Sequence, residues 1–149
     1  MKGNVIVGQS GGPTAAINSS LAGVYRTAKD RGANKVYGML FGIQGLLQER
    51  YIDLSEYITN DLDTELLKRT PAAFLGSCRY KLPEIHENKD VYEKIFSILE
   101  KLDIEAFIYI NPSPYNIFFL PYFHSLSICF DFISKYKNRE KVKSAVLTL

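Results

Sequence analysis

Cysteine and targeting signals are both scarce in this sequence of 149 residues. The only two cysteines, Cys78 and Cys129, lie far apart and form no C-x-x-C pair. We interpret them as free thiols in a reducing compartment. The N-terminal residues lack the charged flank, the long apolar stretch and the small-residue cleavage site of a signal peptide. We therefore expect a cytoplasmic protein.

Long apolar runs and a strong net charge are missing as well. Residues 117–133 are apolar, but proline, histidine, serine and aspartate interrupt a run that is already shorter than the roughly 20 residues of a membrane helix. The net charge is only +2. The basic cluster KYKNREKVK at residues 135–143 is short and contains a glutamate, which is typical of a solvated terminus. We expect neither membrane insertion nor nucleic-acid binding.

The hydrophobic pattern predicts alternating strands and helices as far as residue 110. Short apolar runs at 4–8, 35–40 and 105–110 predict buried strands. Apolar spacings of three and four predict helices from near Thr14 to Gly32 and over 91–102, and residues 63–69 also look helical. The segment FGIQGLLQE at 41–49 predicts glycine-punctuated turns, and 72–77 a short strand or turn. This order predicts one α/β domain built on a parallel sheet with flanking helices.

The pattern changes after residue 110. Residues 111–149 contain three prolines and eight aromatic side chains, with no apolar period of two or 3.6 beyond short runs. We predict a boundary here. Residues 1–110 would form the α/β fold, and residues 111–149 an aromatic and basic tail outside it.

Residues 5–18 read VIVGQSGGPTAAIN, which places a G-x-S-x-G pattern around Ser10 between a strand and a helix. A hydrolase elbow at this serine needs a later histidine and an oxyanion donor from a loop that precedes the nucleophile strand. Almost nothing precedes Ser10, and the two histidines are His86, among charged neighbours, and His124, in the tail. The pattern therefore argues against a serine hydrolase.

The same turn suits a phosphate cradle. Gly11 and Gly12 have no side chains, so backbone N–H groups could approach an anion closely, and the following helix would direct its positive end to the same place. The turn is neither a Walker A loop nor a dinucleotide G-x-G-x-x-G motif. A plain strand-to-helix connection fits the geometry equally well.

Three segments taken together resemble the 6-phosphofructokinase family. They are GQSGGPTAAIN at 8–18, FGIQGLL at 41–47 and FLGSCRYKLPE at 74–84, in the order and at the intervals which that family uses. The resemblance covers residues 3–110. It implies the N-terminal part of a doubly wound, Rossmann-like fold, and phosphoryl transfer from ATP or pyrophosphate to the 1-hydroxyl of fructose 6-phosphate. It further implies Mg²⁺, a role in glycolysis and a homo-oligomer.

Carried over by position, the resemblance implies a donor phosphate site of Gly11, Gly12, Arg79 and Tyr80. Gly12 would meet the phosphates through its backbone, Arg79 would neutralise charge on the transferring group, and Tyr80 would line the pocket. The chemistry agrees, because an arginine fork beside a glycine cradle suits a reaction catalysed by positioning and charge stabilisation. The form GGPTAAIN is more similar to the pyrophosphate-using branch than to the GGDAPG form of the allosteric ATP branch.

Two departures limit what the resemblance implies. The first helix has Ala22 where allosteric ATP enzymes carry an effector-site arginine, and keeps only Arg26. After the strand at 105–110 the family has a Gly-Gly-Asp/Asn-Asp/Gly-Ser turn with a metal ligand, but here residues 111–114 read Asn-Pro-Ser-Pro. The family's Thr-Ile-Asp-Asn-Asp loop, which contains the catalytic base, is absent too. We expect no effector control of that kind, no metal ligand and no retained catalytic base.

Two hypotheses on function follow. The first is the donor-binding portion of a 6-phosphofructokinase that is cut off after residue 110 and inactive alone. The alternative is a non-catalytic paralogue that binds phosphate or nucleotide, or that docks on a full-length subunit. The sequence leaves the choice between ATP and pyrophosphate open.

Overall fold

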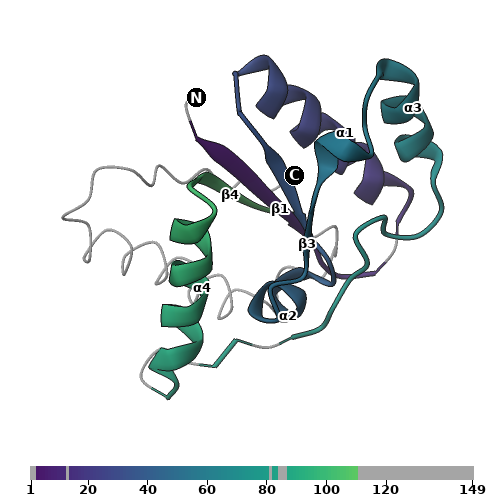
Figure 1. Cartoon of the computed structure of the whole chain (residues 1–149). Coiled ribbons are helices and arrows are strands. Elements are labelled where there is room, and N and C mark those ends of the chain that lie inside the picture. The colour runs from purple at the N-terminus through teal and green to yellow at the C-terminus, as the bar shows by residue number, and fades with distance from the viewer. Residues whose placement is uncertain (1–2, 13, 81, 84–86, 111–149) are drawn as a thin grey trace.

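The computed structural model describes residues 3–12, 14–80, 82–83 and 87–110, which form a sheet flanked by helices (Figure 1). The strands are β1 (Asn4–Gln9), β2 (Val36–Met39), β3 (Tyr51–Asp53) and β4 (Ile104–Ile110). The helices are α1 (Ala15–Asp30), α2 (Gly42–Leu47), α3 (Asp61–Arg69) and α4 (Lys89–Lys101), with a 3-10 turn, η1 (Leu54–Glu56).

The four strands form one sheet in the order β3-β2-β1-β4. β1 pairs in parallel with both β2 and β4, whereas β3 runs antiparallel to β2. The chain therefore passes from β1 to β2 on one side of it, and later returns to form β4 on the other side of β1. Ligands of doubly wound sheets bind at such a reversal of strand order, at the carboxyl ends of the strands.

Helices cover both faces of the sheet, and each face has its own hydrophobic core. Val5 and Val7 of β1 pack into the core on the side of α1 and α3, whereas Ile6 packs into the core on the side of α2 and α4. This alternation follows from the period of two along a strand. Burial on both faces explains why the β1 sequence is a continuous apolar run rather than an alternating one.

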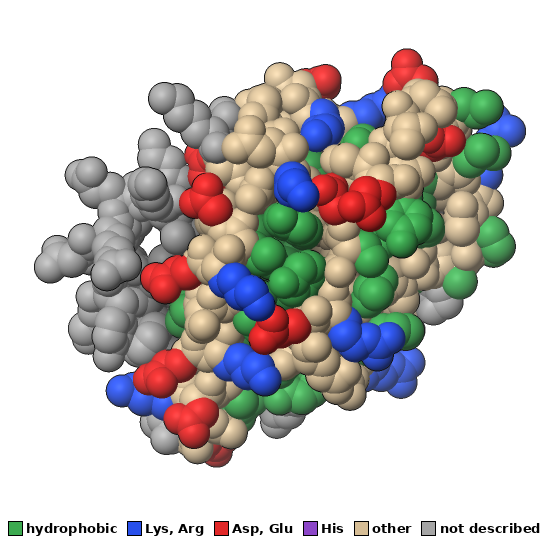
Figure 2. Space-filling view, in the orientation of Figure 1, with side chains coloured by type: hydrophobic (Ala, Val, Ile, Leu, Met, Phe, Trp, Pro, Cys, Tyr) green, Lys and Arg blue, Asp and Glu red, His purple; other side chains and the backbone are tan. Residues whose placement is uncertain are grey.

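The second face is covered incompletely. In Figure 2, hydrophobic side chains reach the surface over the sheet between α4 and β3, with acidic and basic side chains mixed around them. Tyr37, Tyr51 and Phe107 are partly buried members of this core. Tyr37 and Tyr51 pack edge to face, with ring centroids 5.7 Å apart.

The predicted α/β fold with a mainly parallel sheet is confirmed, and so are its long elements: the strands near 4–8, 35–40 and 105–110, and helices α1, α3 and α4. Residues 72–77 form the predicted turn rather than a strand. Helix α3 starts at Asp61, earlier than the predicted residue 63. The reason is a capping box between Asn60 and Asp63, which fixes the first turn more firmly than the apolar spacing does.

Two predictions about elements were wrong, and one strand was missed. Residues 42–47, predicted as turns, form helix α2, and strand β3 was not predicted at all. β3 adds one antiparallel strand at the edge of the mainly parallel sheet. β4 is not fully buried: Ile104, Ala106 and Ile108 are buried, but the residues between them are partly exposed. Within the described sheet β4 lies at an edge, which leaves those side chains accessible.

The predictions on residues 111–149 lie outside the described residues. They include the boundary at residue 110, the aromatic tail, the apolar stretch at 117–133 and the basic cluster, and all of them stay predictions. Within the part of the chain that the structure describes, no helix is both long and apolar enough to cross a membrane.

Candidate functional site

The turn that follows β1 is open to an incoming ligand. Gly11 has a φ of 83°, a conformation that glycine adopts without strain. Gly12 is exposed, and a Cβ built on it would meet no atom of the described residues within 4 Å, its chain neighbours aside. The Ser10 amide donates to the Ile110 carbonyl at 2.9 Å, which ties the start of the turn to the end of β4. The turn is thus anchored at one end and unobstructed at Gly12.

The N-terminus of α1 faces the same turn without a side-chain cap. Thr14 has the extended backbone of an N-cap residue, but its side chain makes no capping hydrogen bond, and the first turn contains no acidic residue. The first N–H groups of a helix have no partner within the helix, and together they carry a partial positive charge. This end of α1 therefore offers donors to an anion beside Gly12.

Hydrogen bonds join the segment Ser77–Arg79 to this turn at the carboxyl edge of the sheet. The Ser77 hydroxyl donates to the Gly11 carbonyl at 2.9 Å, and the Ser10 hydroxyl donates to the Cys78 carbonyl at 3.3 Å. The sequence predicted that the glycine turn and Arg79 belong to one site. The two hydrogen bonds bring their segments together.

Arg79 and Tyr80 follow directly, and both are exposed. Tyr80 has 40% of its surface accessible. Among the described residues, Arg79 has no hydrogen bond or ion pair. An exposed arginine without a carboxylate partner among the described residues is available for an anionic ligand.

A buried polar network positions the segment that leads to Arg79. Gln9 is fully buried, and its Oε1 accepts from the Leu75 amide at 2.9 Å while its Nε2 donates to Asn18 Oδ1 at 3.1 Å. Asn18 Oδ1 also accepts from the Phe74 amide at 2.9 Å, and its Nδ2 donates to the carbonyls of Thr70 and Ala72, each at 2.8 Å. The network therefore joins β1 and α1 to the loop after α3.

Sequence reasoning missed Gln9 and Asn18, although a signal was present. Both are amide side chains at positions that the strand and helix periods assign to the core, and a buried amide needs partners for its donors and acceptor. Residues 70–75 have irregular backbone whose N–H and C=O groups need partners of their own. Matching the two buried amide side chains with the irregular backbone at 70–75 would have predicted that they contact each other.

A hollow of about 350 Å³ opens between α2 and the Ser77–Arg79 segment. Its lining consists of Phe41, Gln44, Gly45, Gln48, Arg50, Ser77 and Cys78. Ser77 belongs both to this lining and to the hydrogen bond with Gly11, so the hollow adjoins the glycine turn. Sequence reasoning did not identify Phe41 or Arg50 as site residues.

Tyr109 of β4 lies beside the same turn. Burial raises the pKa of the Tyr109 phenol to about 12, and a hydrogen bond with Ser10 lowers it by a smaller amount. An unfolded tyrosine has a pKa near 10. The folded state therefore holds this proton more tightly, and its stabilising contribution is present below about pH 10 and lost as the pH rises towards about 12.

We expect Tyr109→Phe to make the free energy of unfolding less sensitive to alkaline pH. Between about pH 10 and pH 12 the parent should lose on the order of 2 kcal/mol more of its free energy of unfolding than the variant. Urea unfolding at several alkaline pH values measures the difference. Tyr57→Phe is a matched control, because Tyr57 is 54% exposed. Parallel pH profiles of the parent and Tyr109→Phe would contradict the assignment.

The serine-elbow alternative gains no support at Ser10, whose hydroxyl is used in the hydrogen bond to Cys78. The two histidines that such a site would need, His86 and His124, lie outside the described residues. No group of three or more His, Cys, Asp or Glu side chains that could hold a metal ion occurs in residues 3–12, 14–80, 82–83 and 87–110.

Arg26, which the resemblance aligns with an effector-site arginine of allosteric relatives, pairs with two acidic residues of this chain. Its guanidinium lies 3.2 Å from an Asp61 carboxylate oxygen and 3.8 Å from one of Glu65. Both carboxylates come from α3, which packs against α1. An anionic effector would have to displace these two partners.

The described residues thus form an α/β protein whose glycine turn lies open at the strand-order reversal of the sheet, next to a helix end without a side-chain cap. The family model for Phosphofructokinase matches residues 4–111. The chain belongs to this family.

Relatives from both branches of the family match the same region. The pyrophosphate–fructose 6-phosphate 1-phosphotransferase of Rhodospirillum rubrum is 39% identical over 111 residues, which are 74% of this chain and 26% of that protein. An ATP-dependent 6-phosphofructokinase of Erwinia tasmaniensis is 33% identical over 102 residues, covering 68% of this chain and 29% of that protein. The higher identity favours the pyrophosphate branch.

A solved structure supports the fold. The pyrophosphate-dependent phosphofructokinase of Marinobacter aquaeolei superposes with a TM-score of 0.74 at 28% identity, covering 97% of this chain and 32% of that one. The present chain thus spans only about a quarter to a third of the length of the relatives that it matches.

Proposed function

We propose that the chain binds the phosphate groups of a phosphoryl donor, pyrophosphate or ATP, at the turn between β1 and α1. Gly11 and Gly12 form the cradle, Arg79 supplies the counter-charge and Tyr80 lines the site. The observation that carries this proposal is the hydrogen bond from Ser77 to Gly11 at 2.9 Å. It joins the segment that carries Arg79 to the open glycine turn.

The physical basis is charge neutralisation by prearranged donors. Charge-assisted hydrogen bonds from a guanidinium are about twice as strong as neutral ones, and exposed N–H groups at α1 add the partial charge of the helix. In phosphoryl transfer such positioning provides most of the catalysis. The open space at Gly12 lets a phosphate oxygen approach the backbone without displacing a side chain.

By family membership the proposed context is transfer to the 1-hydroxyl of fructose 6-phosphate, in glycolysis, in the cytoplasm, by a homo-oligomer with Mg²⁺. The described residues contain no side-chain cluster for a metal, and the sequence after β4 reads Asn-Pro-Ser-Pro where the family has its metal-ligand turn. They do not fit a protein-held Mg²⁺, so we assign no residue to it. We propose donor binding without turnover by this chain alone, with residues 1–110 as the binding portion and residues 111–149 outside it.

Two substitutions test the cradle. Arg79→Ala should weaken pyrophosphate binding by about 10- to 100-fold, because a charge-assisted contact contributes roughly 1.5 to 3 kcal/mol. Gly12→Val should abolish measurable binding without unfolding the chain, because its side chain would enter space that the described residues outside the turn leave open. Isothermal calorimetry of the full chain with pyrophosphate and with ATP measures both effects.

Arg69→Ala is the control, because Arg69 is also an exposed arginine but lies at the end of α3. Binding of pyrophosphate or ATP by the parent, without turnover, would support the proposal. Unchanged affinity in both Arg79→Ala and Gly12→Val would place the site elsewhere, and an absence of binding by the parent would refute the proposal.

A further inference from the structure

Tyr109 lies where three segments of the chain meet beside the glycine turn, although it is not among the residues that would contact the donor. We propose that Tyr109 is a positioning residue for donor binding, whose phenol oxygen holds the glycine turn and the Arg79 segment in place relative to the start of α2. This inference rests on the proposed function, because it concerns how the residues of that donor site are held.

The Tyr109 ring reaches this place because the neighbouring strand has a glycine beside it. Tyr109 pairs with Gly8 across the parallel strands β4 and β1. A Cβ on Gly8 would lie 3.1 Å from Tyr109 Cε2, so its absence lets the ring lie against β1. Phe107, two residues earlier on β4, stacks nearly parallel to the ring, with centroids 6.3 Å apart. These neighbours fix the direction in which the hydroxyl points.

The phenol oxygen lies at the first residues of α2. A Cβ on Gly42 would lie 2.7 Å from Tyr109 Oη and 3.1 Å from Cys78 Sγ, so the phenol and the thiol both lie beside this glycine. The Ile43 amide donates to the phenol oxygen. This amide is among the first N–H groups of α2, which have no partner within the helix. Tyr109 therefore supplies an acceptor that the start of α2 needs.

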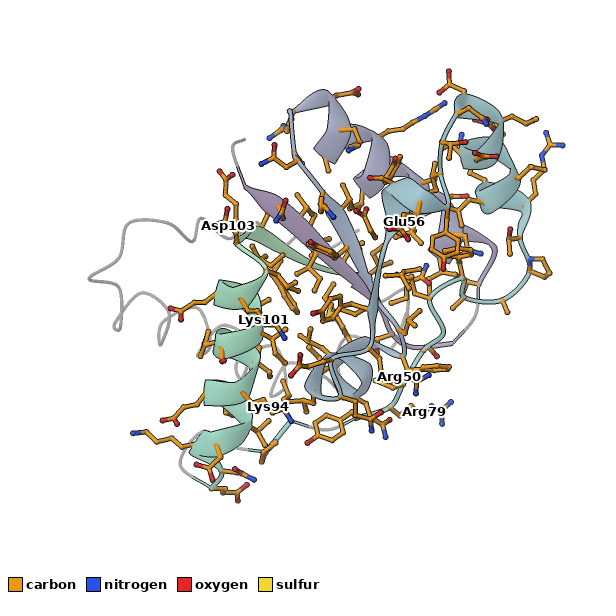
Figure 3. The ribbon with its side chains drawn as sticks, in the orientation of Figure 1. Arg50, Glu56, Arg79, Lys94, Lys101 and Asp103 are labelled. Carbon is orange, nitrogen blue, oxygen red and sulfur yellow. The ribbon has the colours of Figure 1, made fainter. Side chains whose placement is uncertain are left out.

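Two more hydrogen bonds join the phenol to the donor site. One is with the Ser10 hydroxyl, and the other is with the Cys78 thiol. Ser10 lies two residues before Gly12, and Cys78 directly precedes Arg79. Figure 3 shows Arg79 beside α2, the helix whose first residues Tyr109 contacts. Removing the phenol oxygen would therefore take a shared partner from the glycine turn, the Arg79 segment and α2 at once.

Tyr25 provides a matched comparison on the other face of the sheet. It is only 8% exposed, and its hydroxyl donates to the Ile58 carbonyl at 2.8 Å. Both residues belong to the core on the side of α1 and α3. Tyr25→Phe and Tyr109→Phe each keep the ring and remove a hydrogen-bonded hydroxyl. Of these two hydroxyls, only that of Tyr109 is bonded to the segments of the donor site.

The test measures the affinity of the full chain for pyrophosphate by isothermal calorimetry. Tyr109→Phe should weaken binding about 3- to 10-fold, the effect of losing one neutral hydrogen bond, whereas Tyr25→Phe should leave the affinity unchanged. Arg79→Ala should weaken binding less in the Tyr109→Phe background than in the parent, because the arginine is then already displaced.

A spectroscopic measurement on the parent chain adds a readout that does not depend on the stability of a variant. With an isotope label at the tyrosine Cζ atoms, pyrophosphate should shift the nuclear magnetic resonance of Tyr109. The resonance of Tyr25 should stay in place, because its hydroxyl is bonded only to the loop before α3. A purely structural role of Tyr109 would leave both resonances unchanged.

Each outcome supports or overturns the inference. Weaker binding by Tyr109→Phe but not by Tyr25→Phe, less than additive with Arg79→Ala, supports it, and so does a shift of the Tyr109 resonance. Unchanged affinity in Tyr109→Phe, an equal fall in Tyr25→Phe, full additivity or an unmoved Tyr109 resonance overturns it. If Arg79→Ala weakens binding and Tyr109→Phe does not, the donor site stands and only this inference fails. If the parent does not bind pyrophosphate, both proposals fail.

Discussion

Replacing Gly45 by alanine is expected to remove most or all of the stability of the folded state, a loss of more than about 4 kcal/mol. A Cβ at this position would overlap the Leu40 carbonyl oxygen and lie 2.7 Å from its carbonyl carbon. Both are backbone atoms, so no change of rotamer relieves the clash. Helix α2 would have to separate from the end of β2.

Neighbouring hydrogen bonds oppose that separation. The Arg50 amide donates to the Gly45 carbonyl at 2.8 Å, and the Leu40 amide donates to the Arg50 carbonyl at 3.0 Å. Moving Gly45 away from Leu40 breaks this closed loop between β2, α2 and β3. Small domains have roughly 5 to 15 kcal/mol of stability in total, so a loss of this size leaves little folded protein.

Gly23→Ala is the matched control, because it is the same substitution in a place where the chain leaves room. Gly23 is exposed within α1, and no chain atom lies within 4 Å of its Cβ position. Alanine is favoured over glycine in a helix by about 0.5 to 1 kcal/mol, so this variant should be more stable than the parent. Urea unfolding followed by far-UV circular dichroism compares the three proteins. Similar stability in the two variants would show that α2 does not approach Leu40 as described.

The sequence predicts elements whose signal is local and repeated. α1 and α4 show the helical period over several turns, and β1 is a β-branched run closed by glycine. α2 has only six residues, begins at a glycine and contains a second one, so its local preferences favour turns. It is helical because Ile43 and Leu46 are buried against the sheet, a tertiary effect that no window of sequence contains.

Some parts of the candidate site were likewise predictable from the sequence, and others were not. Gly11, Gly12, Arg79 and Tyr80 were predicted because their motifs resemble those of a family, which carries long-range information. The contact between Arg50 and Phe41 was not predicted, because it depends on a left-handed residue and a three-residue strand. Neither of these features has a reliable local signature.

Gln9→Leu is expected to lower the free energy of unfolding by about 3 kcal/mol. Leucine fills a similar volume, so the main loss is of hydrogen bonds. The Leu75 amide would have no acceptor in a residue that is only 1% exposed. An unpaired buried donor costs roughly 1 to 3 kcal/mol, and losing the Gln9 contacts to Ile17 and Asn18 adds to that cost. Gln48→Leu, on an exposed glutamine, should change stability by less than about 0.5 kcal/mol.

Gln9→Leu should also weaken pyrophosphate binding, although the Gln9 side chain is fully buried. Gln9 holds Leu75, and Ser77 and Arg79 follow that residue in the chain. A double-mutant cycle separates this positioning effect from a general loss of stability. If Gln9 acts through Arg79, then Arg79→Ala should weaken binding less in the Gln9→Leu background than in the parent. The affinities should be measured well below the melting temperature of each variant. Equal effects of Arg79→Ala in the two backgrounds would mean that the buried network stabilises the fold without positioning the arginine.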